Sequence, residues 1–126
     1  MLDERPVECT SISANSTSMS QDYTPQEVAE LLKNSDVQLI DVRETSEHLA
    51  GRIAGDRLIA LGTLGEQVDT IDPSRPVVLY CRSGARSAMA AEALRGAGFD
   101  AHNMLGGLLE WDAAGLPLEP DDGYVA

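Results

Sequence analysis

One stretch of the sequence decides the fold class: residues 77–98 read VVLYCRSGARSAMAAEALRGAG. Its first four residues form an apolar, β-branched run, which is typical of a strand that a parallel sheet buries on both faces. The alanine-rich segment 85–95 predicts a helix that ends at Gly96. Residues 81–84 include a glycine and make the turn between the two elements. The stretch therefore predicts a strand–loop–helix unit of an α/β protein.

Strands and helices also alternate on both sides of this unit. The segment Thr24-Pro25-Gln26-Glu27 is a capping box with proline at the first helical position, so it predicts the start of a helix. Apolar spacing and turn signals predict helices at residues 25–33, 46–50, 61–68 and 108–114, and strands at residues 37–42, 57–60 and 101–105. This order is typical of a three-layer α/β/α sandwich, and we expect a mostly parallel sheet of about five strands.

The chain of 126 residues has the length of a single domain. Residues 10–18 are small, polar and without periodicity, so we expect a disordered N-terminal tail over residues 1–20. The domain is expected over residues 21–118, followed by a Pro- and Asp-rich C-terminal tail at residues 119–126. Cys9 lies in the N-terminal tail, where it is either a dispensable residue or a mobile resolving cysteine.

The overall charge and the apolar pattern exclude several classes of partner. At a net charge of −12 the surface repels phosphate backbones and anionic lipids, so neither nucleic acid nor membrane is an expected partner. The apolar runs are shorter than a membrane span, and the acidic N-terminus lacks the apolar core of a signal peptide. Two cysteines without C-x-x-C spacing predict neither a disulfide framework nor a metal site. We therefore expect a cytoplasmic protein with a free thiol.

The loop that begins at Cys81 is suited to binding an anion. A helix N-terminus presents unpaired N–H groups and a partial positive charge, and Arg82 and Arg86 add two cations. Gly84 permits a tight turn in which successive N–H groups point inward. Together these effects should lower the pKa of the Cys81 thiol below its ordinary value. The alternative interpretation is a buried and inert cysteine at the end of a strand.

Three segments of the chain resemble one known family. Residues 81–87, CRSGARS, resemble the active-site loop of the rhodanese homology domain. Residues 41–55, DVRETSEHLAGRIAG, look like the first signature of that family. Residues 103–117, NMLGGLLEWDAAGLP, look like its C-terminal signature. The resemblance extends over nearly the whole expected domain, residues 21–118.

The resemblance implies a sulfurtransferase in which Cys81 is the catalytic residue. Its thiolate would take the sulfane sulfur of a small anionic donor, thiosulfate or a persulfide, and would pass it to cyanide, to a thiol, or to a sulfur-acceptor or sulfur-carrier protein. The resemblance implies neither a cofactor nor a metal. The residues that it places around the donor are Arg82, Ser83, Gly84, Ala85, Arg86, Ser87 and Arg43, with Asp41 as a structural residue near the site.

Two other functions stay open on the sequence. In the related phosphatases and arsenate reductases the loop is one residue longer, C-x5-R, and frames a phosphate, whereas the spacing here is C-x4-R. Some rhodanese-like domains are non-catalytic modules for sulfur sensing or protein interaction; loss of the loop cysteine would favour that class, and Cys81 is present. The donor also stays open, because Ala85-Arg86 replaces the Lys or Thr of some thiosulfate-specific members.

Expectations for the remaining polar and aromatic residues are more general. Arg43 either contributes to the anion pocket or forms a purely structural ion pair with Asp41. Residues 54–56 depart from the usual family pattern, so we expect a local difference in that loop. We expect His102 at the surface and Trp111 in the core.

Overall fold

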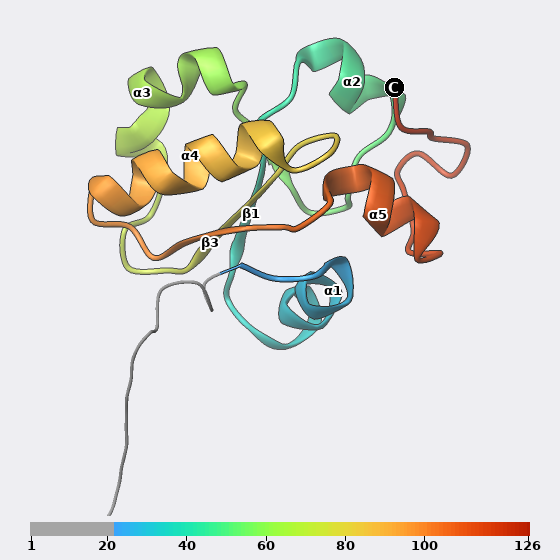
Figure 1. The fold of residues 1–126 in the computed structure, drawn as a ribbon, viewed down its shortest axis with the longest axis horizontal. Helices are drawn as coiled ribbons and strands as arrows, with labels where there is room; N and C mark the ends of the chain where they lie inside the picture. Colours follow the sequence, from blue (N-terminus) through green and yellow to red (C-terminus); the bar gives the residue numbers. More distant parts are fainter. Residues whose placement is uncertain (1–21) are drawn as a thin grey trace, which may run out of the picture.

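The structure, a computed structural model, describes residues 22–126 (Figure 1). The expected N-terminal tail and Cys9 lie outside the described residues. In chain order the elements are α1 (Pro25–Asn34), β1 (Gln38–Asp41), α2 (Thr45–Ala50), β2 (Arg57–Leu58), η2 (Leu61–Thr63), α3 (Leu64–Gln67), η3 (Val68–Thr70), β3 (Val77–Tyr80), α4 (Ala85–Gly96), β4 (Ala101–Asn103) and α5 (Gly107–Ala113). The alternation that the sequence predicts is therefore confirmed.

The four strands among the described residues form one parallel sheet in the order β2-β1-β3-β4. The expected count of about five strands is one too high. At the outer edge of β4, Tyr23 makes a single parallel bridge with Met104. The chain cannot continue as a strand there, because Thr24 already caps α1 and Pro25 begins that helix. At the edge of the sheet where a fifth strand would pair, the described residues therefore form only this single bridge.

Helices cover both faces of the sheet, which confirms the three-layer arrangement. Figure 1 shows β1 and β3 between α3 and α4 on one side and α1 on the other. The core on the side of α3 and α4 contains Ile40, Val42, Ile59, Leu64, Ile71, Val77, Leu79, Cys81, Ala90, Ala91, Leu94 and Ala101. The core on the side of α1 and α5 contains Val28, Leu39, Ile53, Val78, Tyr80, Met104, Leu108 and Trp111. Each fully buried Val, Leu, Ile or Met side chain of these clusters contributes about 1.5–3 kcal/mol.

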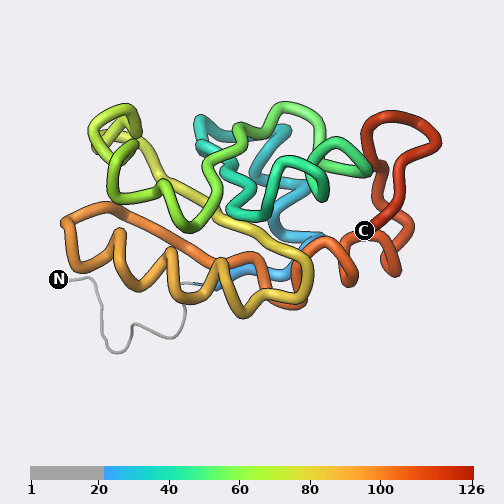
Figure 2. Tube along the Cα trace, turned by 90° about the horizontal axis from the view of Figure 1, so that it is seen from above, coloured from blue at the N-terminus to red at the C-terminus, as the bar shows by residue number. Residues whose placement is uncertain are grey.

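The last residues of the chain lie against α2. Arg52 pairs with Glu119 in an antiparallel bridge, and the N–H of Tyr124 donates to the carbonyl of Ala50 at 2.9 Å. Gly51 is needed at this contact, since a Cβ atom there would come within 2.2 Å of the Tyr124 carbonyl oxygen. Figure 2 shows this C-terminal segment at one end of the molecule, in red. Residues 119–126, expected as a tail, are therefore held by backbone hydrogen bonds.

The structure confirms the predicted burial of Trp111 but not the predicted exposure of His102. Trp111 is buried, as predicted, and its Nε1–H donates to the Pro117 carbonyl at 2.8 Å. His102 is buried as well, so the prediction of a surface residue is wrong. It lies on β4, which pairs with β3, and its imidazole contacts the ring of Tyr23 at a centroid distance of 4.8 Å and an interplanar angle of 39°. None of the described helices is both long and apolar enough to cross a membrane.

Candidate active site

The loop from Cys81 to Ser87 lies at the carboxyl end of β3, where parallel α/β sheets bind their ligands. Gly84 stands immediately before α4 with φ of 105°, a conformation that favours glycine. The start of α5 binds the backbone of the loop through two hydrogen bonds. The N–H of Leu108 donates to the Cys81 carbonyl at 2.8 Å, and the N–H of Leu109 donates to the Arg82 carbonyl at 3.0 Å. A Cβ at Gly107 would come within 2.5 Å of the same Arg82 oxygen, so only glycine fits.

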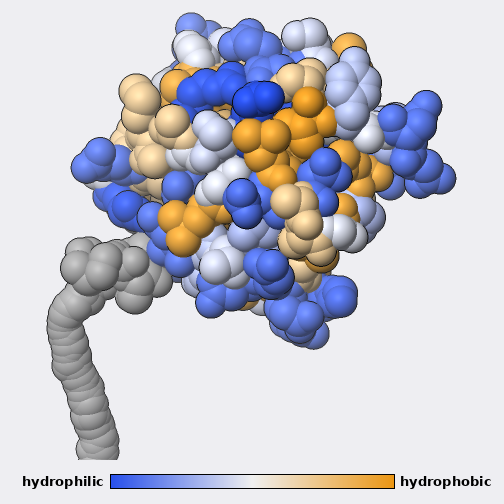
Figure 3. All heavy atoms as spheres, turned by 45° about the vertical axis from the view of Figure 1, so that its right-hand side comes forward, coloured by the Kyte–Doolittle hydropathy of each residue, from blue (hydrophilic) through white to orange (hydrophobic). Residues whose placement is uncertain are grey.

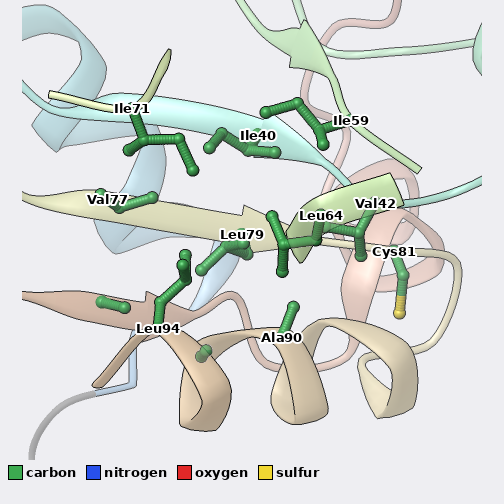
Figure 4. Packing of buried hydrophobic residues seen from close by; sticks show 12 residues of the cluster. Ile40, Val42, Ile59, Leu64, Ile71, Val77, Leu79, Cys81, Ala90 and Leu94 are labelled. Atoms are coloured by element: carbon green, nitrogen blue, oxygen red, sulfur yellow. The ribbon is translucent and has the colours of Figure 1, made fainter. Parts of the chain in front are cut away.

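The sulfur of Cys81 accepts hydrogen bonds from the loop and from the first turn of α4. The N–H of Gly84 lies 3.1 Å from Sγ, and the N–H and the hydroxyl of Ser87 each lie 3.4 Å away. Figure 4 shows the sulfur at the end of β3, pointing toward the first turn of α4. Burial raises the pKa of the Cys81 thiol, but the hydrogen bonds from Ser87, Gly84 and Ser83 outweigh it and hold the pKa below its ordinary value. The side chain is buried, as an inert cysteine would be, yet its sulfur faces donors that favour a thiolate.

Asn103, which lies in the C-terminal family signature and was not predicted at the site, is also part of it. Its Oδ1 lies 2.6 Å from the hydroxyl oxygen of Ser87, and both side chains are buried. The Ser87 hydroxyl has one hydrogen, and it also lies within reach of Sγ of Cys81 and of the Gly84 carbonyl. Asn103 therefore competes with the sulfur for that hydrogen. The signal in the sequence is a polar residue at the carboxyl end of the strand that pairs with β3.

Glu47 is a second residue that was not predicted at the site. Its two carboxylate oxygens each lie 2.9 Å from a guanidinium nitrogen of Arg86, the last residue of the C-x4-R loop. The hydrogen bonds from Arg86 lower the pKa of Glu47 to about 2. The second loop cation, Arg82, is exposed, and its Nε donates to the Ala126 backbone oxygen at 3.0 Å. Ser83 and Ala85 are exposed at the mouth of the loop.

Arg43 and Asp41 form a fully buried ion pair. Nε and Nη2 of Arg43 lie 2.9 and 2.8 Å from the two carboxylate oxygens of Asp41, and Nη2 also donates to the Gly51 carbonyl at 2.6 Å. Both side chains have no exposed surface. Of the two interpretations that the sequence leaves open for Arg43, these contacts support the structural ion pair, because Nε and Nη2 already donate to protein acceptors, although the buried Nη1 has no hydrogen-bond partner among the described residues.

Asp41 of this pair, His48 and Asp56 offer three ligand atoms that lie close enough together to bind a cation. His48 Nδ1 lies 3.0 Å from a carboxylate oxygen of Asp41 and 3.6 Å from one of Asp56. However, the Arg43 guanidinium occupies both oxygens of Asp41, and the Tyr80 hydroxyl donates to Asp56 at 2.6 Å. Burial raises the pKa of Asp56. We interpret the cluster as a hydrogen-bond network beneath α2, because the fixed positive charge of Arg43 opposes a second cation.

Comparisons with known proteins agree with this geometry. A family model described as the rhodanese-like domain matches residues 24–114. The chain is 43% identical over 75 residues to the uncharacterized protein YqhL of Bacillus subtilis, and the match covers 59% of this chain and 60% of YqhL. It is 30% identical over 99 residues to the thiosulfate sulfurtransferase GlpE of Actinobacillus succinogenes, a match that covers 78% of this chain and 89% of the relative. A solved structure of a rhodanese-related protein from Thermoplasma volcanium superposes with a TM-score of 0.73 at 28% identity, covering 77% of this chain and 95% of the other.

Proposed function

Since the chain belongs to the rhodanese-like domain family, we propose that it is a sulfurtransferase that carries sulfur as a persulfide on Cys81. One observation carries the proposal: the Cys81 sulfur lies at the junction of β3 and α4 and accepts hydrogen bonds from Gly84 and Ser87. These donors lower the pKa of a thiol that burial alone would raise. A lower pKa increases the ionised fraction of the thiol, and the thiolate is the nucleophile.

The proposed reaction has two steps. The Cys81 thiolate attacks the sulfane sulfur of the donor, so that a new S–S bond forms and the bond within the donor breaks. With thiosulfate, sulfite leaves with the electron pair; with a persulfide, a thiolate leaves. An acceptor nucleophile then attacks the outer sulfur of the Cys81 persulfide and restores the thiolate. The N–H groups of Gly84 and Ser87 stabilise the negative charge of the thiolate, and we expect N–H groups of the loop to hold the outer sulfur of the persulfide in the same way.

The donor class that we propose is thiosulfate or a persulfide. The relative GlpE, which is named for thiosulfate, supports the first. The C-x4-R loop is too short for the phosphate-binding loop of the related phosphatases, which supports a sulfane sulfur as the transferred group. A reducing compartment such as the cytoplasm would keep Cys81 available for this chemistry.

A protein that accepts sulfur is a further proposed partner. Large apolar side chains are exposed on the two helices that contact the loop: Leu49 on α2, which also carries Glu47, and Leu109 on α5, whose backbone N–H donates to the Arg82 carbonyl. Tyr124 is exposed beside Ala50. Figure 3 brings this side of the molecule forward and shows apolar residues gathered among hydrophilic ones. Exposed apolar residues grouped in this way are typical of a surface that binds protein.

Sulfur transfer is tested with thiosulfate and cyanide. We expect the full chain to form thiocyanate and to gain the mass of one sulfur atom when it is incubated with thiosulfate alone. The Cys81→Ser variant should do neither, because a hydroxyl does not form the persulfide. Absence of the added sulfur with both thiosulfate and a persulfide donor would contradict the proposal. Hydrolysis of p-nitrophenyl phosphate by the same protein would point to a phosphatase instead.

A further inference from the structure

We infer that Glu47 determines donor specificity: by holding Arg86, it disfavours donors with two negative charges and favours donors with a single one. The inference rests on the proposed function, because it concerns which donor Cys81 meets. It begins from the position of Arg86, which ends the loop and lies in the first turn of α4. Glu47 comes from α2, 39 residues earlier in the chain, so that only the fold brings the two together.

The carboxylate of Glu47 is held in place from two sides. Both of its oxygens accept from the Arg86 guanidinium, and Oε1 also accepts from the N–H of Glu44 at the start of α2, at 2.9 Å. Its side chain is 17% exposed and that of Arg86 is 36% exposed. The pair therefore lies at the rim of the site, where an incoming anion could compete with the carboxylate for the guanidinium.

The charges decide the outcome of that competition. Because the pKa of Glu47 is about 2, its carboxylate stays ionised at any physiological pH. It offsets the charge of Arg86 and leaves the exposed Arg82 as the other loop cation, in a chain of net charge −12. A dianion such as thiosulfate must displace Glu47 or bind without the full charge of Arg86. A donor with one negative charge loses less binding free energy in this arrangement, since its Coulomb repulsion from the Glu47 carboxylate is smaller than that of a dianion.

Two matched donors separate this role from a merely structural one. Thiosulfate and methanethiosulfonate carry the same sulfane sulfur on a sulfonyl group, but the first has two negative charges and the second has one. In the Glu47→Gln variant we expect kcat/KM for thiosulfate to rise relative to methanethiosulfonate by up to about fivefold, mainly through a lower KM. Glutamine keeps the size of the side chain and can still accept from the Glu44 N–H. If Glu47 only held the loop in shape, Glu47→Gln would change kcat/KM for both donors by the same factor.

A double-mutant cycle links the effect to Arg86. In the Arg86→Gln background, Glu47→Gln should change the ratio of the two donors by a different factor than in the wild type, because only the charge of the carboxylate then acts and there is no guanidinium to hold; an equal factor in both backgrounds would show that Glu47 does not act through Arg86. Glu66→Gln is the matched control, since Glu66 is an exposed residue of α3 and its removal changes the total charge by the same amount. If Glu66→Gln raises the donor ratio as much as Glu47→Gln does, the effect is one of net charge and the inference is overturned.

A binding measurement keeps the test independent of sulfur transfer. Sulfate is an unreactive dianion, and its binding at the loop should slow alkylation of Cys81 by iodoacetamide. The sulfate concentration that gives half protection should be up to about fivefold lower in Glu47→Gln than in the wild type. An unchanged or higher concentration would overturn the inference, even if the protein transfers sulfur. Conversely, a protein that takes up no sulfur but shows the expected sulfate effect would contradict the proposed function alone. Glu47→Ala serves as a second variant if Glu47→Gln does not fold.

Discussion

The Arg43–Asp41 pair and the Arg86–Glu47 pair have nearly the same hydrogen-bond distances and very different surroundings. Each guanidinium meets both oxygens of its carboxylate at 2.8–2.9 Å. The first pair has no exposed surface, whereas the side chains of the second are 36% and 17% exposed. Loss of one partner leaves a buried charge in the first pair and a solvated one in the second. Burial therefore makes one pair part of the scaffold and leaves the other free to exchange partners.

The largest effect is expected from Arg43→Met. This variant leaves the Asp41 carboxylate buried without its cation, so the free energy of unfolding should fall by about 3–5 kcal/mol. Urea denaturation followed by circular dichroism measures the loss. The matched Arg86→Met variant should lose less than about 1 kcal/mol, because Glu47 then turns to water. Equal losses in the two variants would show that burial does not separate the pairs.

The Asn103→Asp variant extends the comparison to a buried contact beside the nucleophile. A carboxylate at this position would hold the Ser87 hydroxyl hydrogen more firmly than the amide oxygen does and would repel the thiolate. The pKa of Cys81 should therefore rise, and its alkylation rate at pH 7 should fall by more than about tenfold. The rate of iodoacetamide modification against pH measures this change. An unchanged pH profile would mean that Asn103 acts on packing alone.

Ser87→Ala should act in the same direction and more weakly. It removes one hydrogen-bond donor from the sulfur but introduces no charge, and the N–H groups of Gly84 and Ser87 remain. The alkylation rate at pH 7 should fall by about 3–10-fold, which corresponds to one hydrogen bond. Ser83→Ala is the control, since the Ser83 side chain is exposed at the mouth of the loop and its N–H is retained. A decrease after Ser83→Ala as large as that after Ser87→Ala would argue against a specific role for the Ser87 hydroxyl.

The smallest effects should appear in the dependence of stability on pH. The pKa of Glu47 falls from 4.5 to about 2 through its hydrogen bonds with Arg86, so its contribution is present above pH 4.5 and is lost as the pH falls toward 2. Burial raises the pKa of Asp56, so ionisation of Asp56 with rising pH opposes folding. Glu47→Gln should cost less than about 1 kcal/mol at pH 6 and almost nothing at pH 2.

The Asp56→Asn variant should change the pH dependence of stability in the opposite direction to Glu47→Gln. The amide oxygen can still accept from the Tyr80 hydroxyl, while the cost of a buried charge disappears. Relative to the wild type, the variant should therefore gain stability as the pH rises from 3 to 7. Urea midpoints across this range measure both variants. A loss after Glu47→Gln that is as large at pH 2 as at pH 6 would mean that the carboxylate of Glu47 does not stabilise the fold through its charge.

The sequence predicted the parallel sheet, its helical layers and the position of Cys81 between a strand and a helix because their signals are local. The apolar run at residues 77–80 and the capping box at Thr24 each lie within a few residues of what they determine. The strand count was too high because a single bridge at Tyr23 depends on where α1 begins. His102 was misplaced because its burial depends on a ring from the other end of the described chain.

The sequence by itself determined that Cys81 follows a buried strand and precedes a helix, and hence that backbone N–H groups surround its sulfur. Only the tertiary structure decided which side chains join it. Asn103 comes from a strand that pairs beside β3, and Glu47 from a helix 39 residues before the arginine that it binds. Hydrogen bonds and ion pairs require contact in space, and contacts between distant segments follow from the packing of the layers. Local spacing does not encode them.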